Sequence, residues 1–544
     1  MLYIMPFLLA MVVTMIWLPV FSRIAAKWRI VDHPGERKVH AVPIPRIGGV
    51  AMAIGVLVAA LLVVPLELTD KYFLAAGGVV ALFGALDDRF DLDYRIKLIG
   101  QLLAATIVIL GGDIQIHAVT LDERLLLPEG AAIPLTFIFL IGITNAINLA
   151  DGLDGLAGGT TFLSLCALAL LAYSGSQFSS AALALTFAGA ILGFLRFNTF
   201  PASVFMGDAG SQLLGFAVGV LSLRATQSAS SAVSAATPIL LLALPILDTL
   251  SVMVHRISEG RSPFSADKNH IHHKLLSFGF GHHEAVMVIY AIQADLFLLA
   301  YWMRYESDLV IVGLVSVFFL IAIALMQITE RRKWRFRMHK DAPNNSPLSR
   351  FVTALLKPQY LPRWSYFAVA TALGVYAATV MAEANSVAGD IKWLLIALLS
   401  VTTLWPLILR VQPFSVVEKC ALYVTAAVLV YLDTVVLSDQ RMFSLINWSA
   451  IAIAAVGTML RLRLSKDRRF ELTPLDLIVL FVALVVPSLP DSIGLPHGGA
   501  LGIAKLVILF YAVEVLVTRV EIGVIWLRIG VASLLAGLIV RPMI

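Results

Sequence analysis

Aspartates stand together at the end of an apolar stretch, where they could bind a cation. Asp87, Asp88 and Asp91 form a DDxxD cluster directly after the apolar run 72–86. Neighbouring carboxylates repel one another, so holding them at a helix end favours a cation or a proton between them. A solvated acidic helix end is the alternative interpretation of this cluster when it is taken alone.

A second acidic cluster lies in the glycine-rich segment NAINLADGLDGLAGG. It places Asn148, Asp151 and Asp154 at spacings of three, which predicts that their side chains lie near one face of a helical turn. The glycines between and after them let the backbone approach a ligand closely. Oxygen ligands from Asp and Asn suit a hard cation such as Mg²⁺, which also binds substrate phosphates. A glycine-rich turn with two capping aspartates is the alternative.

The third motif is RFNTFPASVFMGDAGSQLLGF. Asp208 and Ser211 are predicted to open a new apolar helix, whose N–H groups and dipole would face the same side as the other clusters. Asp208 alone would also fit an N-cap. In the preceding loop, Asn198 could hydrogen-bond a nucleotide base and Phe205 could stack on it.

A fourth segment, HRISEGRSPFSADKNHIHHKLL, is rich in basic side chains. A zinc site is disfavoured, because the segment offers no cysteine partner and no third histidine at helical spacing. Arginines and histidines around an anion fit a diphosphate better. The basic residues are Arg256, Arg261, Lys268, His270, His272, His273 and Lys274, whereas His282 and His283 are assigned to a loop.

These clusters are set among long apolar stretches. The 544 residues are 59% hydrophobic and 14% charged, with a mean hydropathy of +0.90, whereas soluble domains contain about 25% charged residues. Stretches of membrane-spanning length recur from residues 2–21 to 522–540. Cys166 and Cys420 both lie in such stretches, which disfavours a disulfide framework or a thiolate metal site. We therefore predict an all-α polytopic membrane protein.

Charge asymmetry predicts which side of the membrane the clusters face. The first loop is strongly basic, so the positive-inside rule places it in the cytoplasm and the N-terminus outside. Its basic residues are Arg23, Lys27, Arg29, Arg37, Lys38 and Arg46. Counting spans onward places all four clusters on the cytoplasmic face. Their convergence there predicts phosphoryl chemistry on an anionic substrate, with metal bridging and electrostatic stabilisation.

A polar segment divides the chain unequally. Residues 1–330 are predicted to form a core with about eleven spans, 331–363 a basic cytoplasmic linker, and 364–544 a region with six or seven further transmembrane helices. No internal repeat is visible, so an inverted-repeat transporter receives no support. No motif in the last region indicates its role.

The motifs of the core, in this order and spacing, resemble the polyprenyl-phosphate N-acetylhexosamine-1-phosphate transferase superfamily. The resemblance is carried by DHPGERKVHAVPIPRIGG, GALDDRFDLDYRIKLIGQ, NAINLADGLDGLAGG, FNTFPASVFMGDAGS and SPFSADKNHIHH. The HIHH and PRIGG forms are more similar to the WecA/TagO branch than to the MraY branch. The resemblance implies an eleven-helix core, Mg²⁺ with Mn²⁺ as an alternative, undecaprenyl or decaprenyl phosphate, and a UDP-N-acetylhexosamine such as UDP-GlcNAc.

The resemblance also implies roles for single residues. Asp208 resembles the metal aspartate and Asn148 a second metal ligand, and Asp87 and Asp88 resemble the pair that meets the lipid phosphate. Asp151 is catalytically important in this comparison, without a fixed role.

The remaining motif residues resemble substrate contacts. The residues that resemble uridine contacts are Asp154, Asn198 and Phe205. The residues that resemble the diphosphate and sugar pocket are Arg261 and the catalytic histidines His270, His272 and His273. The first cytoplasmic motif, which resembles a further part of the substrate site, contains Lys38, His40 and Arg46.

The expected reaction transfers a sugar 1-phosphate from the UDP-sugar to the lipid phosphate and releases UMP, at the cytoplasmic face of a bacterial inner membrane. It would be the first membrane step of a cell-envelope polysaccharide, such as a cell-wall polymer or an O-antigen. No nucleic-acid partner is expected, and a homodimer is compatible with the sequence. An ion-coupled transporter is the rival hypothesis, but its acids should lie near mid-span rather than at one interface. For residues 364–544, a scaffold role stays open.

Overall fold

The computed structural model describes residues 4–28, 30–32, 43–121, 123–228, 231–262, 270–332, 361–384, 386–387, 389–409, 416–433, 444–464, 499–518 and 524–542. These residues are almost entirely helical, and their strands form only two two-stranded sheets. Eight of the described helices are long and apolar enough to cross a membrane. The prediction of an all-α polytopic membrane protein is therefore confirmed.

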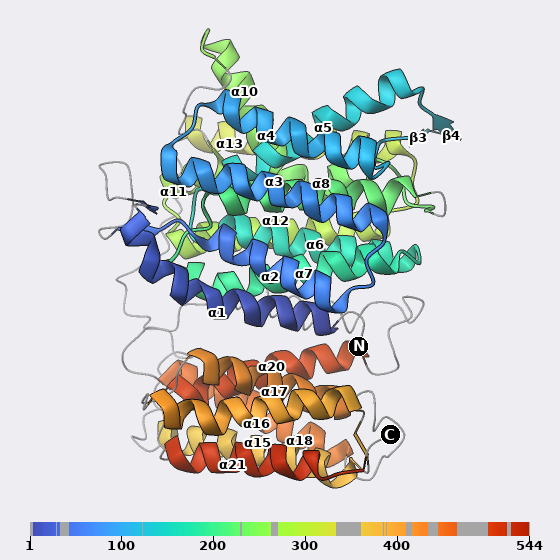
Figure 1. Cartoon of the computed structure of the whole chain (residues 1–544). Coiled ribbons are helices and arrows are strands. Elements are labelled where there is room, and N and C mark those ends of the chain that lie inside the picture. The colour runs from blue at the N-terminus through green and yellow to red at the C-terminus, as the bar shows by residue number, and fades with distance from the viewer. Residues whose placement is uncertain are drawn as a thin grey trace. The chain divides into compact units, whose positions relative to one another are not determined.

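The chain divides into two compact units, and the described helices from α1 to α13 belong to the first (Figure 1). Its elements are α1 (Ile4–Trp28), β1 (Val31–Asp32), β2 (Ile44–Pro45), α2 (Gly48–Val63), α3 (Leu68–Phe90), α4 (Tyr94–Thr106), η1 (Ile107–Gly111), β3 (Ala118–Thr120), β4 (Arg124–Leu126), α5 (Glu129–Ala150), α6 (Leu156–Ser174), α7 (Phe178–Asn198), α8 (Gly207–Gln227), α9 (Thr237–Leu241), α10 (Ala243–Ser258), α11 (Ile271–Ser277), α12 (His282–Trp302) and α13 (Asp308–Arg331). Taking α4 with η1 and α9 with α10, and setting the short α11 aside, the described residues give the eleven core helices expected.

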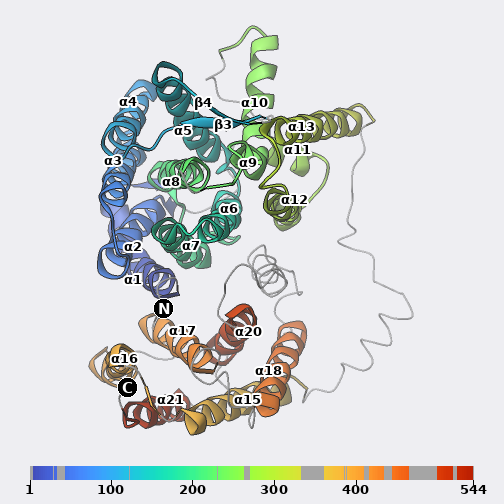
Figure 2. The same cartoon turned by 90° about the vertical axis from the view of Figure 1, so that its right-hand side faces the viewer.

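Helix α8 is the centre of the first unit. It packs against α2, α3, α5, α6 and α7, and Figure 2, which looks nearly along these helices, shows it inside their ring. Almost every residue from Ala209 to Thr226 is buried. Since α8 has neighbours on all sides, it is apolar around its circumference rather than along one stripe. Its first turn is thereby held beside the ends of α3 and α5.

Two glycines allow the neighbouring helices to touch the backbone of α8. A Cβ atom on Gly84 of α3 would lie 2.5 Å from Ala209 Cα, and one on Gly49 of α2 would lie 2.0 Å from Gly210 N. Both distances are far below van der Waals contact, so neither position has room for a side chain. The first turn of α8 is consequently fixed from two sides.

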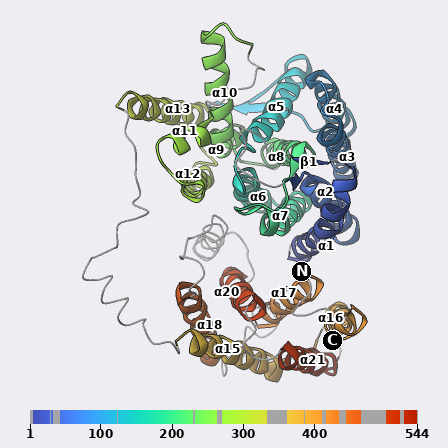
Figure 3. The same ribbon diagram turned by 90° about the vertical axis from the view of Figure 1, so that its left-hand side faces the viewer.

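The second unit contains the described helices α15 (Leu361–Glu383), α16 (Gly389–Leu409), α17 (Val416–Tyr431), α18 (Ser444–Leu464), α20 (Gly499–Thr518) and α21 (Val524–Ile539). Figure 3 shows α15 beside α18 and α17 beside α20, pairs that are in contact. Tyr366, Val369 and Leu516 belong to an apolar core to which α15, α18 and α20 contribute.

Parts of the predicted organisation fall on residues that are not described. Of the basic linker 331–363, only residues 331–332 and 361–363 are described, and the predicted span 475–486 lies outside the described residues. The boundaries at 330 and 363 therefore stay predictions.

Candidate active site

Three charged side chains from three helices meet at the first turn of α8. The ammonium of Lys97, in α4, lies 2.6 Å from Asp87 Oδ2 and 3.0 Å from Asp208 Oδ2. Asp87 sits in the last turn of α3, as its position after an apolar run predicted, and Asp208 opens α8. One cation thus offsets the repulsion between two carboxylates. The sequence analysis missed Lys97, although a lysine within an apolar span was the available signal.

Asp88 holds the start of α8 in place. Its Oδ1 accepts a hydrogen bond from the Asp208 N–H at 2.9 Å, and its Oδ2 accepts one from the Ala209 N–H at 3.0 Å. A carboxylate on these N–H groups is favourable, because they have no partner within the helix and carry the positive end of its dipole. Asp88 therefore lies against the backbone of Asp208 and fixes the part of the chain that carries the Asp208 carboxylate. Its predicted contact with lipid phosphate stays a prediction.

Amide side chains extend the site along α8. Asn148 donates to Ser211 Oγ at 2.7 Å and also forms a hydrogen bond with Asp208. Gln212 donates to Asp208 Oδ2 at 3.2 Å and accepts from Gln101 at 3.1 Å. This network brings Asn148 next to Asp208, as a shared metal site requires.

Asp151 lies just beyond the end of α5. Burial raises the pKa of Asp151 to about 7, and the nearby carboxylates of Asp208, Asp154 and Asp88 act in the same direction, whereas Arg46 opposes them. Helix α5 ends at Ala150, so the prediction that Asp151 and Asp154 share a helical turn with Asn148 is wrong. The chain has left the helix before Gly152, and Gly155, with φ of 83°, takes a left-handed conformation that glycine tolerates.

The oxygen-rich group of Asp87, Asn148, Asp151 and Asp208 offers the ligand types that a hard divalent cation prefers. Within the described part of the chain, no three His, Cys, Asp or Glu side chains are placed to hold one ion together. Mg²⁺ is commonly bound by one or two carboxylates, with waters and substrate phosphates as its other ligands. The donor set therefore fits such an ion.

Asp154 and Asn198 join two loops of the site. Asp154 Oδ2 accepts from the Ala202 N–H at 2.9 Å. The buried Asn198 side chain accepts from the Gly155 N–H at 2.9 Å and donates to the Val204 carbonyl at 2.9 Å. Both side chains thus fix the loops after α5 and α7, and their direct contact with uridine stays a prediction.

The end of the first loop forms another wall. The Phe205 N–H donates to the Pro45 carbonyl at 2.8 Å, and the Gly48 N–H donates to the Phe205 carbonyl at 2.9 Å. Arg46, between them, is ion-paired with Asp32. Arg46 and Phe205 are therefore brought together beside α8. Lys38 and His40 lie outside the described residues.

An aspartate orients the first histidine of the HIHH motif. Nδ1 of His270 lies 2.8 Å from Asp248 Oδ2, and the Ile271 N–H donates to Asp248 Oδ1 at 2.6 Å. Both side chains of the His270–Asp248 pair are buried. An aspartate in this arrangement fixes the ring orientation and the tautomer. Asp248 was missed in the sequence, where one acid in the apolar segment before His255 was the signal.

The histidines stack on one another and face the loop after α5. The rings of His270 and His272 are 5.6 Å apart and nearly parallel, and those of His272 and His273 are 4.3 Å apart. A Cβ atom on Gly152 would lie 2.2 Å from His272 Nε2, so the loop passes directly over this ring. Burial, aided by the charge of His273, lowers the pKa of His272 to about 3. His272 is thus a neutral hydrogen-bonding group at physiological pH.

Arg261 is the predicted residue least integrated with the others. It lies beyond the end of α10, where its guanidinium is exposed and 3.0 Å from Glu259 Oε2. The following residues, 263–269, are not described. The structure therefore shows Arg261 paired with Glu259, and its role in binding diphosphate stays a prediction.

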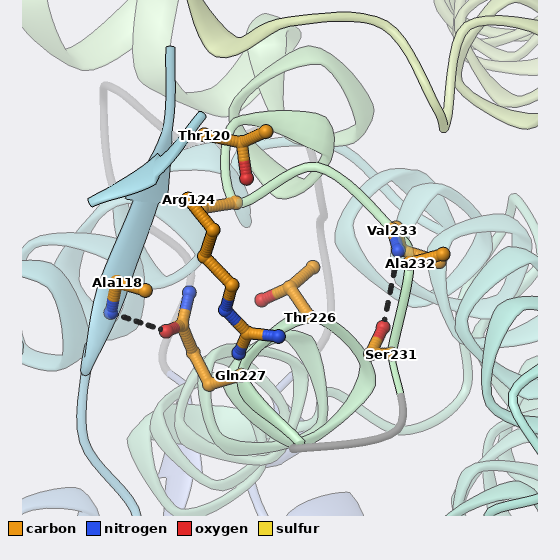
Figure 4. A pocket seen from close by; sticks show the side chains of 9 residues that line it. Ala118, Thr120, Arg124, Thr226, Gln227, Ser231, Ala232 and Val233 are labelled. Carbon is orange, nitrogen blue, oxygen red and sulfur yellow. Dashed lines mark hydrogen bonds between the residues drawn. The ribbon is translucent and has the colours of Figure 1, made fainter. Parts of the chain in front are cut away.

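A separate polar pocket lies at the other end of α8. Figure 4 shows Arg124 extending between Thr120 of the β3–β4 hairpin and Gln227, with Thr226 and Ser231 nearby. Since α8 rises about 1.5 Å per residue, this pocket lies about 28 Å from Asp208. Gln227 fixes the hairpin by accepting from the His117 and Ala118 N–H groups at 3.0 Å. The pocket is thus distinct from the carboxylate cluster.

Comparison with known proteins agrees with this geometry. Residues 71–226, which contain Asp87, Asp151 and Asp208, match the family described as glycosyl transferase family 4. The chain is 40% identical over 290 residues to the probable undecaprenyl-phosphate N-acetylglucosaminyl 1-phosphate transferase of Bacillus subtilis, covering 53% of this chain and 80% of that protein.

Two further relatives come from other bacterial groups. Identity is 37% over 298 residues to a decaprenyl-phosphate N-acetylglucosaminephosphotransferase of Mycolicibacterium smegmatis, covering 49% of this chain and 73% of the relative. It is 32% over 333 residues to an undecaprenyl-phosphate alpha-N-acetylglucosaminyl 1-phosphate transferase of Yersinia pestis, covering 59% and 90%. The carboxylate cluster at the first turn of α8, the histidine stack beside it and these similarities lead to one conclusion: the chain belongs to glycosyl transferase family 4, as a membrane-embedded transferase.

Proposed function

We propose that this protein transfers N-acetylglucosamine 1-phosphate from UDP-GlcNAc to undecaprenyl or decaprenyl phosphate and releases UMP. The observation that carries the proposal is the meeting of Asp87, Lys97 and Asp208 at the first turn of α8. Two carboxylates and one ammonium carry a net negative charge. This group can therefore bind phosphate only together with a further cation. The names of the relatives support the lipid acceptor and the transferred group.

Asp208 and Asn148 would hold the Mg²⁺ ion, for which Mn²⁺ is the alternative. When bound, the ion would supply positive charge that offsets the negative charge of the donor phosphates. Asp88 contributes by fixing the backbone of Asp208. Asp87 and Lys97 present a carboxylate and an ammonium to the same region, where the ammonium is shared between Asp87 and Asp208.

The transfer itself needs little general-base catalysis. A phosphate monoester has its second pKa near 6, so the lipid phosphate is largely a dianion at neutral pH. Its oxygen attacks the sugar-bearing phosphorus, the bond from that phosphorus to the bridging oxygen breaks, and UMP leaves with the electron pair. Bringing two anions together is the main obstacle, so positive charge would be needed from the metal that Asp208 and Asn148 would hold, while His272 would offer a hydrogen bond.

The proposed site faces the cytoplasm of a bacterial inner membrane, where the donor UDP-sugar is made. The basic first loop supports this orientation, because Arg46 at its end belongs to the site. The product would enter a cell-envelope polysaccharide.

The direct test uses purified full-length enzyme in detergent with Mg²⁺. We expect polyprenyl phosphate and UDP-GlcNAc to give polyprenyl diphosphate GlcNAc, identified by mass spectrometry, in preference to other UDP-sugars. Direct displacement further requires that enzyme, donor and Mg²⁺ without lipid release no stoichiometric UMP. A burst of UMP would instead indicate a phospho-enzyme on Asp87 or Asp88.

A further inference from the structure

Three aromatic rings meet where the loop after α7 reaches the start of α12. The rings of Phe200 and His282 are stacked, with centroids 4.2 Å apart at 26°, and the ring of His283 stands edge-on to Phe200 at 5.0 Å and 90°. Helix α12 begins at His282, so the assignment of these histidines to a loop is wrong. None of the three rings has a part in the chemistry proposed above.

His282 is fixed in this group from two sides. Phe200 covers one face of its ring, and the ring forms a hydrogen bond with the backbone of Asp154. Asp154 in turn accepts from the Ala202 N–H at 2.9 Å. His282 therefore links the loop after α5, the loop after α7 and helix α12, and its ring has little freedom to turn.

The second ring nitrogen of His282 is not used by this framework. Nε2 is buried and has no hydrogen-bond partner among the described residues. A buried polar atom without a partner is destabilising, so most such atoms are satisfied by protein, water or ligand. The contacts with Phe200 and Asp154 hold the ring in the orientation that leaves Nε2 without a partner among the described residues.

His282 also belongs to the same region as the histidine stack. Its charge would act on His272, and Asp154, to which it is bonded, acts on Asp151. Aromatic rings and an imidazole are suited to the uncharged hydrogen-bonding groups of a base or a ribose. The lipid phosphate would be better matched by the ammonium of Lys97.

We propose that His282 is a further substrate-binding residue, which hydrogen-bonds the nucleoside part of the donor through Nε2 while Phe200 and Asp154 hold its ring in position. This inference rests on the proposed UDP-sugar donor. It adds a donor contact that the HIHH motif does not contain.

The test compares two isosteric variants of the full chain. Asparagine can reproduce a hydrogen bond of Nδ1 and glutamine one of Nε2. His282→Asn therefore keeps the hydrogen bond to Asp154 but removes the hydrogen-bonding group that Nε2 offers to the ligand. His282→Gln keeps a group at the position of Nε2 but removes the hydrogen bond to Asp154. His283→Phe is the matched control, because it keeps the edge-on ring at Phe200.

Binding of radiolabelled UMP and of UDP-GlcNAc is measured by equilibrium dialysis, and kcat and KM are measured for both substrates. We expect His282→Asn to weaken UMP binding and raise the donor KM by about tenfold, the loss of one hydrogen bond, with kcat and the lipid KM nearly unchanged. His282→Gln keeps the group for the ligand but loses the hydrogen bond to Asp154, so it should be affected less than His282→Asn. His283→Phe should equal wild type.

Equal UMP binding by the Asn and Gln variants, with a change only in thermal stability, would overturn the inference and leave the transferase proposal intact. If wild-type enzyme neither binds UMP nor turns over UDP-GlcNAc, the proposed function fails, and this inference fails with it.

Discussion

The two units both bury charged side chains, but they compensate them differently. In the first unit, Asp87 and Asp208 share Lys97, and Asp88 and Asp151 lie close by. In the second, Lys505 lies 2.6 Å from Asp433, and Arg528 lies 2.7 Å from Glu418, so each acid has its own base. Negative charge thus accumulates at the first turn of α8, whereas Asp433 and Glu418 of the second unit are each paired with one base.

The environment of Asp433 completes the contrast. Tyr376 donates to its Oδ2 at 2.9 Å and Asn447 to its Oδ1 at 3.0 Å, while Lys505 lies 4.5 Å above the ring of Trp448. A fully satisfied network of this kind holds helices in register. An excess of carboxylates near one helix end is instead typical of a functional site. Chemistry is therefore expected at the carboxylates of the first unit, whereas the ion pairs of the second unit stabilise its structure.

The largest expected effect is that of Asp208→Asn. This change removes one charge from the carboxylate cluster and should lower turnover by about a thousandfold or more, because a bound metal supplies several kcal/mol at the transition state. Insertion and folding should be retained. Turnover is measured as lipid-linked product per monodisperse enzyme, and wild-type activity in this variant would remove Asp208 from the site.

Asp433→Asn should act on stability instead. It leaves Lys505 buried without its counter-charge, which costs about 3 kcal/mol or more, so the midpoint of thermal unfolding in detergent should fall clearly. Turnover per folded molecule should stay at the wild-type level. The double variant Asp433→Asn with Lys505→Met is the control and should regain part of the lost stability. A loss of kcat without a loss of stability would contradict the comparison.

A smaller effect is expected from His272 at acidic pH. Its folded pKa of about 3 lies below the ordinary value of 6.5, so between these values the unfolded chain binds a proton that the folded protein does not. Stability should therefore fall as the pH drops below about 6.5, by up to about 1.4 kcal/mol per pH unit, and this contribution is constant above it. His272→Gln should lose less stability than wild type between pH 7 and pH 5. Parallel curves for the two proteins would show that His272 does not titrate in this way.

The smallest effect is expected from removing the second unit. A chain ending near Ser346 keeps every motif of the carboxylate and histidine clusters and should retain transferase activity per folded molecule. Detergent chromatography must first show that the shortened chain is monodisperse. A folded but inactive protein would mean that the second unit completes the site or the lipid groove.

Residue type and order predicted most of the fold and singled out Asp87, Asp151 and Asp208, which the structure brings close together, but did not predict their partners. Asp87, Asp151 and Asp208 could be identified because each follows or opens an apolar stretch. Their shared partner Lys97 could not, since nothing local shows that α4 directs it at two acids on other helices. Asp248 and His282 were missed for the same reason. Asp248 binds His270 and His282 binds Asp154, and each partner is distant in the sequence.

Local geometry set a second limit. A spacing of three suggested one helical turn for Asn148, Asp151 and Asp154, but α5 ends at Ala150. The sequence did not indicate that the amide of Asn198 also binds the backbone of Gly155 and Val204; its contact with a base stays a prediction. Such hydrogen bonds depend on how two loops meet, which a single sequence does not specify.

The close contact of α2 and α3 with α8 has a consequence for heritable variation. At Gly49 and Gly84, even one added methyl group would push against the backbone that carries Asp208. Gly78 and Gly142, by contrast, have nothing within 4 Å of an added Cβ atom. A library of single codon changes screened for transferase activity should therefore be nearly empty at the first pair and well populated at the second, so that these two glycines tolerate as little change as the acids themselves.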